Sequence, residues 1–165
     1  MQIGEGFAGD GPNAAHINTV LGSKEGAVGT AWATALATPT RGHAPFVVVV
    51  KPNVPVKPFT LFVNKAAFDG DKNERHARLT WGAAQAGVAE GVAAAVRQGI
   101  VSEVEADELL LIAAVWVNPN ADDEHAVYAN NEAATLAALL AGRDGAPTVA
   151  DVLAAGPPQN PFFPA

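Results

Sequence analysis

The stretch PNVPVKPFTLFVNK, residues 52–65, decides the fold class because it joins two strand-like segments through a connection that cannot be helical. Its three prolines restrict their own backbone and that of the residues before them, which favours an extended chain. The β-branched run at residues 46–50 precedes it and is typical of a strand buried on both faces. Residues 60–65 predict the second strand, so two strands follow one another without an intervening helix.

A strand and a helix are predicted on the N-terminal side of this stretch. Residues 14–21 alternate between the two faces of a strand, and this places His16 and Asn18 on the same face. Residues 23–38 then carry apolar side chains at helical spacing, and Pro39 ends that helix because its ring cannot continue the backbone hydrogen bonds.

A longer helix is predicted on the C-terminal side. Apolar residues recur at three- and four-residue steps between Trp81 and Val96, with Thr80 as a candidate cap and Gly99 as the end. Gln85 lies within the apolar face of this helix, which is an unusual place for an amide.

The remaining elements alternate between helix and strand. Ser102 and Glu105 form a possible capping box for a short helix, and residues 109–117 have the composition of a central strand. Residues 122–141 predict a further helix, whose acidic first residues suit a helix N-terminus and which Gly142 can end.

The predicted order is β-β-α-β-β-α-β-α, followed by one or two helical turns at residues 149–155. Hairpin-like pairs interrupt the helices, which argues against a strictly alternating parallel fold. We predict an α+β protein with a mixed β-sheet covered by helices on one face. The 165 residues, 49% of them hydrophobic, fit a single domain over residues 1–165.

Composition narrows the classes of partner. A formal charge of −7 argues against general binding to nucleic acid or to an anionic membrane surface. The absence of cysteine excludes disulfides and thiolate chemistry, and the four histidines lack the spacing of a helical metal site, so we expect no metal. No apolar run approaches the roughly 20 residues of a spanning helix, and we expect a soluble, cytoplasmic protein that binds a small molecule or another copy of itself.

Three side chains are candidates for chemistry, and each has a structural alternative. His16 can donate a proton to a leaving hydroxyl near neutral pH, or it can be an ordinary strand histidine. Lys65 can hold an anionic or carbonyl group of a ligand, or it can be a solvated lysine at a strand end. Gln85 can form hydrogen bonds with a heterocycle, or it can satisfy a buried backbone group.

Two stretches of the chain resemble the formaldehyde-activating enzymes, which join formaldehyde to tetrahydromethanopterin. Residues 9–17, GDGPNAAHI, match the family pattern Gly-Asp-Gly, three residues, Ala-His-Ile. Residues 52–65 are similar to the pattern Pro-Asn-x-Pro-x-Lys-Pro-x-Thr-Leu-x-x-Asn-Lys. Shorter similarities extend the resemblance over nearly the whole chain, at residues 82–89, 99–100, 121–123 and 131–133.

The resemblance implies a ribosomal protein S5 domain 2-like fold with a left-handed β-α-β crossover, assembled as a homopentamer with sites between subunits. It implies tetrahydromethanopterin as a co-substrate, no covalently bound cofactor, and a role in one-carbon metabolism or formaldehyde detoxification. By match to the family positions, His16 would be the acid that helps hydroxide leave as water, and Lys65 and Gln85 would contact the pterin.

The chain departs from the family pattern at several substrate-binding positions. Asn18 stands where the family has Asp, Ala67 where it has Thr, and Val47 where it has Leu; Ala86 follows Gln85 in place of His. Asn18 cannot be an anionic partner for an imidazolium. Two other hypotheses therefore stay open: a non-catalytic protein that binds or senses a pterin, a folate or a formaldehyde adduct, and an enzyme for a different amine or carbonyl compound.

Overall fold

The computed structural model describes residues 1–66 and 74–160, and a five-stranded mixed sheet in the order β1-β2-β7-β6-β3 lies at its centre. Only the neighbours β6 and β7 are parallel, while the other pairs are antiparallel. A separate two-stranded sheet contains β4 and β5. The strands are β1 Gln2–Ala8, β2 Ala15–Ser23, β3 Phe46–Val47, β4 Val49–Lys51, β5 Val54–Pro55, β6 Phe59–Asn64 and β7 Leu109–Trp116.

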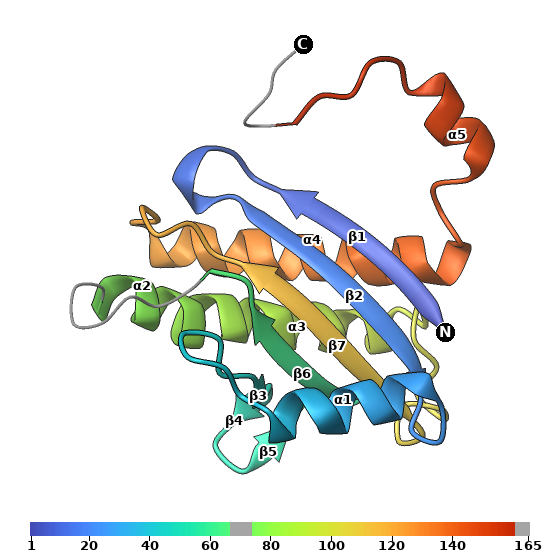
Figure 1. Cartoon of the computed structure of the whole chain (residues 1–165), viewed down its shortest axis with the longest axis horizontal. Helices are drawn as coiled ribbons and strands as arrows, with labels where there is room; N and C mark the ends of the chain where they lie inside the picture. Colours follow the sequence, from blue (N-terminus) through green and yellow to red (C-terminus); the bar gives the residue numbers. More distant parts are fainter. Residues whose placement is uncertain (67–73, 161–165) are drawn as a thin grey trace.

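Two long helices, α3 (Gln85–Arg97) and α4 (Glu124–Asp144), cover one face of the five-stranded sheet (Figure 1). The main apolar core lies between them and the sheet. Helix α1 (Ala27–Ala37) lies across the opposite face near the end of β2, where Gly22 meets Val28. The α+β prediction is therefore confirmed, and helices α3 and α4 lie over one face as expected, with α1 as the exception.

Alternation along β2 and β7 decides which side chains enter the core. Ile17 and Leu21 are buried, whereas His16 and Asn18 on the same strand are exposed. This matches the two-residue period of a strand with one covered face. Strand β7 occupies the middle position of the sheet, which confirms the prediction of a central strand there.

The helical segment before β7 is longer than the sequence pattern predicted. It begins with α2 (Glu74–Arg78), passes through a π-helical stretch η3 (Leu79–Ala84) and continues as α3 until Gly99, which has a φ of 69°. The predicted cap at Thr80 is wrong, because this residue is fully buried inside η3. The left-handed conformation confirms the predicted end at Gly99.

The predicted continuous strand at residues 46–50, buried on both faces, is wrong. It divides into β3 and β4 at Val48, whose N–H donates to the carbonyl of Thr60 while its own carbonyl accepts from the N–H of Val56. Val48 is fully buried but Val50 is 59% exposed. The segment lies at the edge of the sheet, so β-branched composition alone did not reveal its exposure.

Two further helix boundaries differ from the expectation. Residues 101–108 form turns rather than a short helix, so the capping box at Ser102 and Glu105 is absent. Helix α4 runs through Gly142 and ends before Gly145, which adopts φ 63°. Its beginning agrees with the acidic pattern, because the side chain of Asp123 accepts hydrogen bonds from two backbone N–H groups of the first turn.

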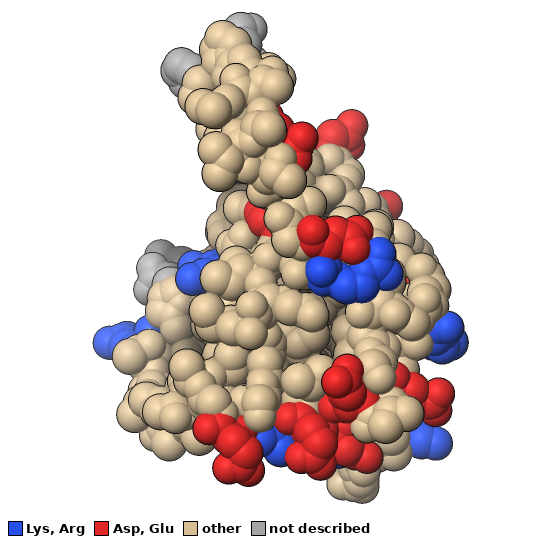
Figure 2. All heavy atoms as spheres, turned by 90° about the vertical axis from the view of Figure 1, so that its right-hand side faces the viewer, with Lys and Arg blue, Asp and Glu red and all other residues tan. Residues whose placement is uncertain are grey.

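A C-terminal arm, residues 146–160, extends away from the sheet and helices (Figure 1). It contains the predicted turns as helix α5 (Val149–Ala154), which begins with a capping box between Thr148 and Asp151. Val149, Val152 and Leu153 are 78%, 58% and 81% exposed. Figure 2 shows the arm as a projection made mainly of uncharged residues.

Acidic side chains gather at the opposite end of the face shown in Figure 2. The turn before β7 contributes to this acidic character, since residues 103–108 contain four carboxylates. Across the described segments of the chain, no helix combines the length and apolarity needed to cross a membrane.

Two glycines of β1 allow α4 to approach the sheet unusually closely. A Cβ atom at Gly4 would overlap the backbone carbonyl of Ala138, and one at Gly6 would overlap the carbonyl of Ala134. Backbone atoms on both sides of the contact leave no flexible side chain that could move away. Close packing of α4 on β1 therefore depends on the missing side chains at these two positions.

The substitution Gly6→Ala is expected to lower the free energy of unfolding by about 3 kcal/mol, as measured by urea denaturation, because the new methyl group overpacks a backbone contact. Gly82→Ala is the matched control, since a Cβ atom at Gly82 meets no atom within 4 Å. A loss at Gly6 no larger than that at Gly82 would contradict the described packing.

Candidate active site

Four adjacent strands place Phe7, His16, Trp116 and Lys65 in one row on the face opposite α3 and α4, which we call the open face. His16 lies directly between Phe7 of β1 and Trp116 of β7 in the strand registers. Lys65 directly follows β6, and its N–H still donates to the carbonyl of Val115, so it continues the register opposite Trp116. The row brings an imidazole, two aromatic rings and an ammonium group to the same end of the sheet.

The turn before β2 holds His16 in place through contacts with α4. The Oδ1 atom of Asn13 accepts hydrogen bonds from the N–H groups of Asp122 at 3.0 Å and Asp123 at 3.2 Å. The side chain of Asn130 donates to the carbonyl of Asn13 at 2.8 Å. This turn includes residues 9–11, and its anchoring fixes the start of the strand that carries His16.

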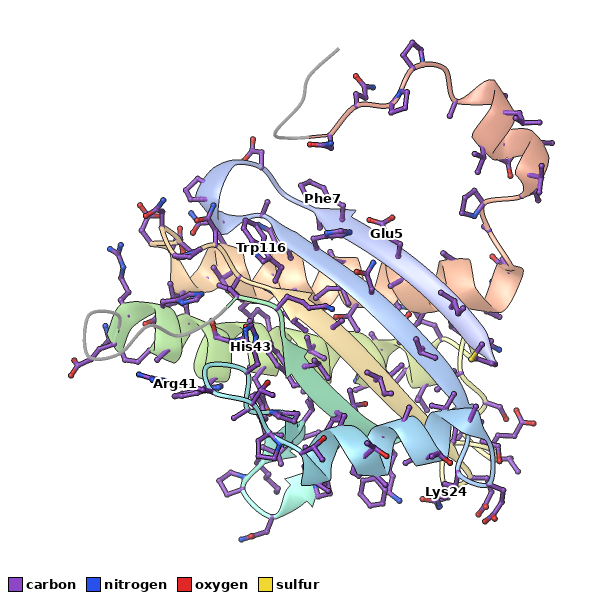
Figure 3. The ribbon with its side chains drawn as sticks, viewed as in Figure 1. Glu5, Phe7, Lys24, Arg41, His43 and Trp116 are labelled. Atoms are coloured by element: carbon purple, nitrogen blue, oxygen red, sulfur yellow. The ribbon has the colours of Figure 1, made fainter. Side chains whose placement is uncertain are left out.

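Glu5 is the immediate polar partner of His16. Its Oε1 atom lies 3.0 Å from Nε2 of His16, and the two side chains are 59% and 45% exposed. The ring of Phe7 lies on the same face, 6.3 Å from the imidazole between centroids and tilted by 54°. Figure 3 shows Glu5, Phe7 and Trp116 together on the open face.

Sequence reasoning placed Asn18 beside His16 but missed Glu5. In the strand register Glu5 lies directly opposite Asn18, so a carboxylate reaches His16 from the neighbouring strand. The detectable signal was the alternation of Ile3, Glu5 and Phe7 in β1. Assigning these residues to the face of His16 required the register of the hairpin, which the sequence pattern had not supplied.

Lys65 is exposed and lies two strands from His16, about 10 Å away at the usual strand spacing. Within residues 1–66 and 74–160 it forms no ion pair, so its ammonium group is available to a ligand. The structure therefore brings His16, Asn18 and Lys65 to one face. Ala67, the remaining candidate on this segment, lies outside the described residues.

Gln85 and Val47 line a separate pocket of about 400 Å³ at the β3 edge of the sheet, together with Phe46 and Trp81. The Oε1 atom of Gln85 accepts a hydrogen bond from the N–H of Val49 at 2.7 Å. The oxygen of Gln85 therefore satisfies a backbone N–H group, which was the structural alternative for this residue. Its amide nitrogen remains as a donor for a ligand in this pocket.

The loop before β3 connects the rim of this pocket to the end of β6. Nδ1–H of His43 donates to the carbonyl of Asn64 at 2.9 Å, next to Lys65, while Ala44 lines the pocket. His43 and Arg41 lie on this loop in Figure 3. Even so, Val47 lies at the sheet edge and Gln85 in the helix layer. Within a single chain, neither residue lies beside His16.

The other histidines take no part in either group. His76 is buried with Nε2 at 2.9 Å from the carbonyl of Val117, and His125 is exposed in the first turn of α4. In the described portion of the chain, no three His, Cys, Asp or Glu side chains cluster in a way that could hold a metal ion.

Comparison with known protein families gives one assignment. The family model described as formaldehyde-activating enzyme matches residues 3–161. The chain belongs to the formaldehyde-activating enzyme family. The resemblance seen at residues 9–17 and 52–65 is thereby confirmed over nearly the whole sequence.

Curated relatives within this family are similar in sequence over almost all of the chain. The 5,6,7,8-tetrahydromethanopterin hydro-lyase of Methanosarcina barkeri is 40% identical over 152 residues, which are 92% of this chain and 84% of the relative. Proteins named bifunctional enzyme Fae/Hps from Methanococcoides burtonii and Archaeoglobus fulgidus are 40% and 38% identical over 153 residues. The chain spans only 38% of the length of each bifunctional relative.

Replacing Gln85 by Met is expected to lower the free energy of unfolding by about 1–3 kcal/mol in urea denaturation, because the N–H of Val49 loses its acceptor. Gln98→Met, the same change at an exposed position after α3, serves as the control. Equal stabilities of the two variants would show that the amide of Gln85 has no structural role.

Proposed function

We propose that this chain is a cytoplasmic enzyme, one domain over residues 1–165, that condenses formaldehyde with tetrahydromethanopterin or a related reduced pterin. The product is the methylene adduct, and water is lost. The observation that carries the proposal is the exposed imidazole of His16 on the open face, paired with Glu5 and in one row with Lys65. The hydro-lyase name of the Methanosarcina barkeri relative supports the same reaction.

The proposed chemistry needs an acid at the step that releases water. A nitrogen of the pterin attacks formaldehyde and gives a hydroxymethyl adduct. His16 donates a proton to the hydroxyl oxygen, the carbon–oxygen bond breaks to release water, and the nitrogen lone pair forms an iminium. The second pterin nitrogen then attacks this carbon and closes the methylene bridge, with loss of its own proton to solvent. Positioned proton donation of this kind contributes about 10²- to 10⁴-fold in rate.

The remaining site residues are proposed to hold the pterin, which acts as a co-substrate rather than a bound cofactor. Lys65 supplies a cation beside Trp116, and Asn18 of β2 and Ala67 are two further proposed substrate-binding positions. At the sheet edge, Val47 and the free amide nitrogen of Gln85 would meet the heterocycle in the 400 Å³ pocket. Such a pocket, mostly apolar with a few polar groups, is typical of small-molecule sites.

We further propose a ribosomal protein S5 domain 2-like fold with a left-handed crossover from β6 to β7. The order of these parallel strands in Figure 1, with α2 and α3 behind them, supports this handedness. Right-handed crossovers are otherwise strongly preferred.

A homopentamer with sites between subunits is proposed as the assembly. Two observations support contacts between copies: the site residues of one chain lie in two separate groups, and the C-terminal arm exposes three large apolar side chains. A neighbouring copy could bring its edge pocket to the open face and cover these apolar groups. Exposed clusters of this kind commonly mark protein interfaces.

The protein is expected to speed formation of the methylene adduct from formaldehyde and tetrahydromethanopterin beyond the spontaneous rate, followed by absorbance. His16→Ala is expected to remove at least about 99% of this acceleration because the proton donor is lost. His125→Ala, at an exposed position on α4, should retain it. Tight pterin binding without acceleration would instead indicate a binding or sensing protein.

Light scattering during size-exclusion chromatography is expected to give a mass five times the 16.8 kDa of one chain. The double substitution Val152→Asp and Leu153→Asp should lower this mass, because charges would be placed in the contact between copies. Val104→Asp, at a turn position that is 90% exposed, should leave it unchanged. A monomeric wild-type protein would contradict the proposed assembly.

A further inference from the structure

The contact between Glu5 and His16 distinguishes the two nitrogens of the imidazole. Oε1 of Glu5 lies 3.0 Å from Nε2, a hydrogen-bond distance, and a carboxylate can only accept when it is ionised. The proton in this contact therefore belongs to Nε2. The other ring nitrogen, Nδ1, is the one left to face a ligand.

The neighbouring strands place an aromatic residue on each side of His16. Phe7 and Trp116 occupy the positions directly opposite His16 on β1 and β7, and the Phe7 ring lies 6.3 Å from the imidazole. Among the described residues, Asn18 and Lys65 also lie at this end of the open face. Lys65 cannot accept a hydrogen bond and lies two strands away, whereas the carboxylate of Glu5 lies 3.0 Å from Nε2 and can orient the ring.

We infer that Glu5 is a positioning residue for His16, which holds the proton on Nε2 so that Nδ1 exchanges the proton with the substrate. The inference rests on the proposed function and adds to it the atom of His16 that acts. It also supplies the anionic partner that Asn18 cannot provide.

The proton transfer follows from this assignment. In the imidazolium both nitrogens carry protons, and Nε2–H donates to Glu5. The Nδ1–H bond breaks as the proton passes to the hydroxyl oxygen of the hydroxymethyl adduct, and water leaves with the electrons of the carbon–oxygen bond. The neutral imidazole that remains already carries its proton on the nitrogen bound to Glu5, so no rearrangement of the ring is needed. An orienting carboxylate has the same role beside the histidine of serine proteases.

The test uses two substitutions of Glu5 and one remote control. Glu5→Ala removes the acceptor, whereas Glu5→Gln removes only the charge and adds an NH2 group that can donate to an unprotonated Nε2, so that neither variant fixes the tautomer. Glu103→Ala changes an exposed carboxylate in the turn before β7 and should behave as wild type. Because Glu5 is 59% exposed on β1, all three variants should fold, which urea denaturation verifies.

The first measurement does not depend on activity. Nitrogen-15 NMR of the neutral imidazole, assigned by comparison with His16→Ala, should show the proton on Nε2 in the wild type and a mixture of tautomers in Glu5→Ala and Glu5→Gln. An identical tautomer population in the wild type and Glu5→Ala would overturn the inference, whatever the activity.

The second measurement is steady-state kinetics of methylene adduct formation. Glu5→Ala and Glu5→Gln should each lower kcat roughly tenfold or more with little change in KM for the pterin. An unchanged kcat in Glu5→Ala would also overturn the inference. If the wild type shows no acceleration, the proposed function fails, and the NMR result still decides whether Glu5 orients His16.

Discussion

The structure depends on the pairing of the central strand β7 with β2 on one side and β6 on the other. One pairing is antiparallel and the other parallel, so β7 joins an N-terminal hairpin to a crossover unit within one sheet. Because side chains alternate along β7, one face of the strand contributes to the core and the other to the candidate site. Leu111, Ala113 and Val115 are buried under the helices, while Trp116 stands between His16 and Lys65 on the open face.

The sequence predicted elements with clear periodicity and missed features that depend on distant neighbours. The alternation around His16 and the strand at residues 109–117 were correct because local pattern and burial agree there. The run at residues 46–50 was wrong because edge position and a change of partner at Val48 are set by strands elsewhere in the chain. Thr80 looked like a cap because the helical turns before it are too polar to show an apolar face.

The candidate site shows the same division. Motifs identified His16, Lys65 and Gln85, and the family resemblance was confirmed. Neither source indicated Glu5, because its contact with His16 arises from hairpin register rather than from spacing along the chain. Nor did they show that Gln85 already uses its oxygen for the N–H of Val49, so that one side chain supports the β3 edge and keeps only its nitrogen for a ligand.

The paired glycines of β1 have a consequence for how accurately the hairpin assembles. If β1 shifted by one residue, Ile3 and Glu5 would turn toward the carbonyls of α4, where even a methyl group does not fit. Gly4 and Gly6 therefore disfavour any register of β1 against β2 that is shifted by one residue. A shifted register would clash with the backbone of α4. The relative position of the Glu5 carboxylate and the His16 imidazole therefore depends on two glycines whose α-carbons face the opposite side of the sheet.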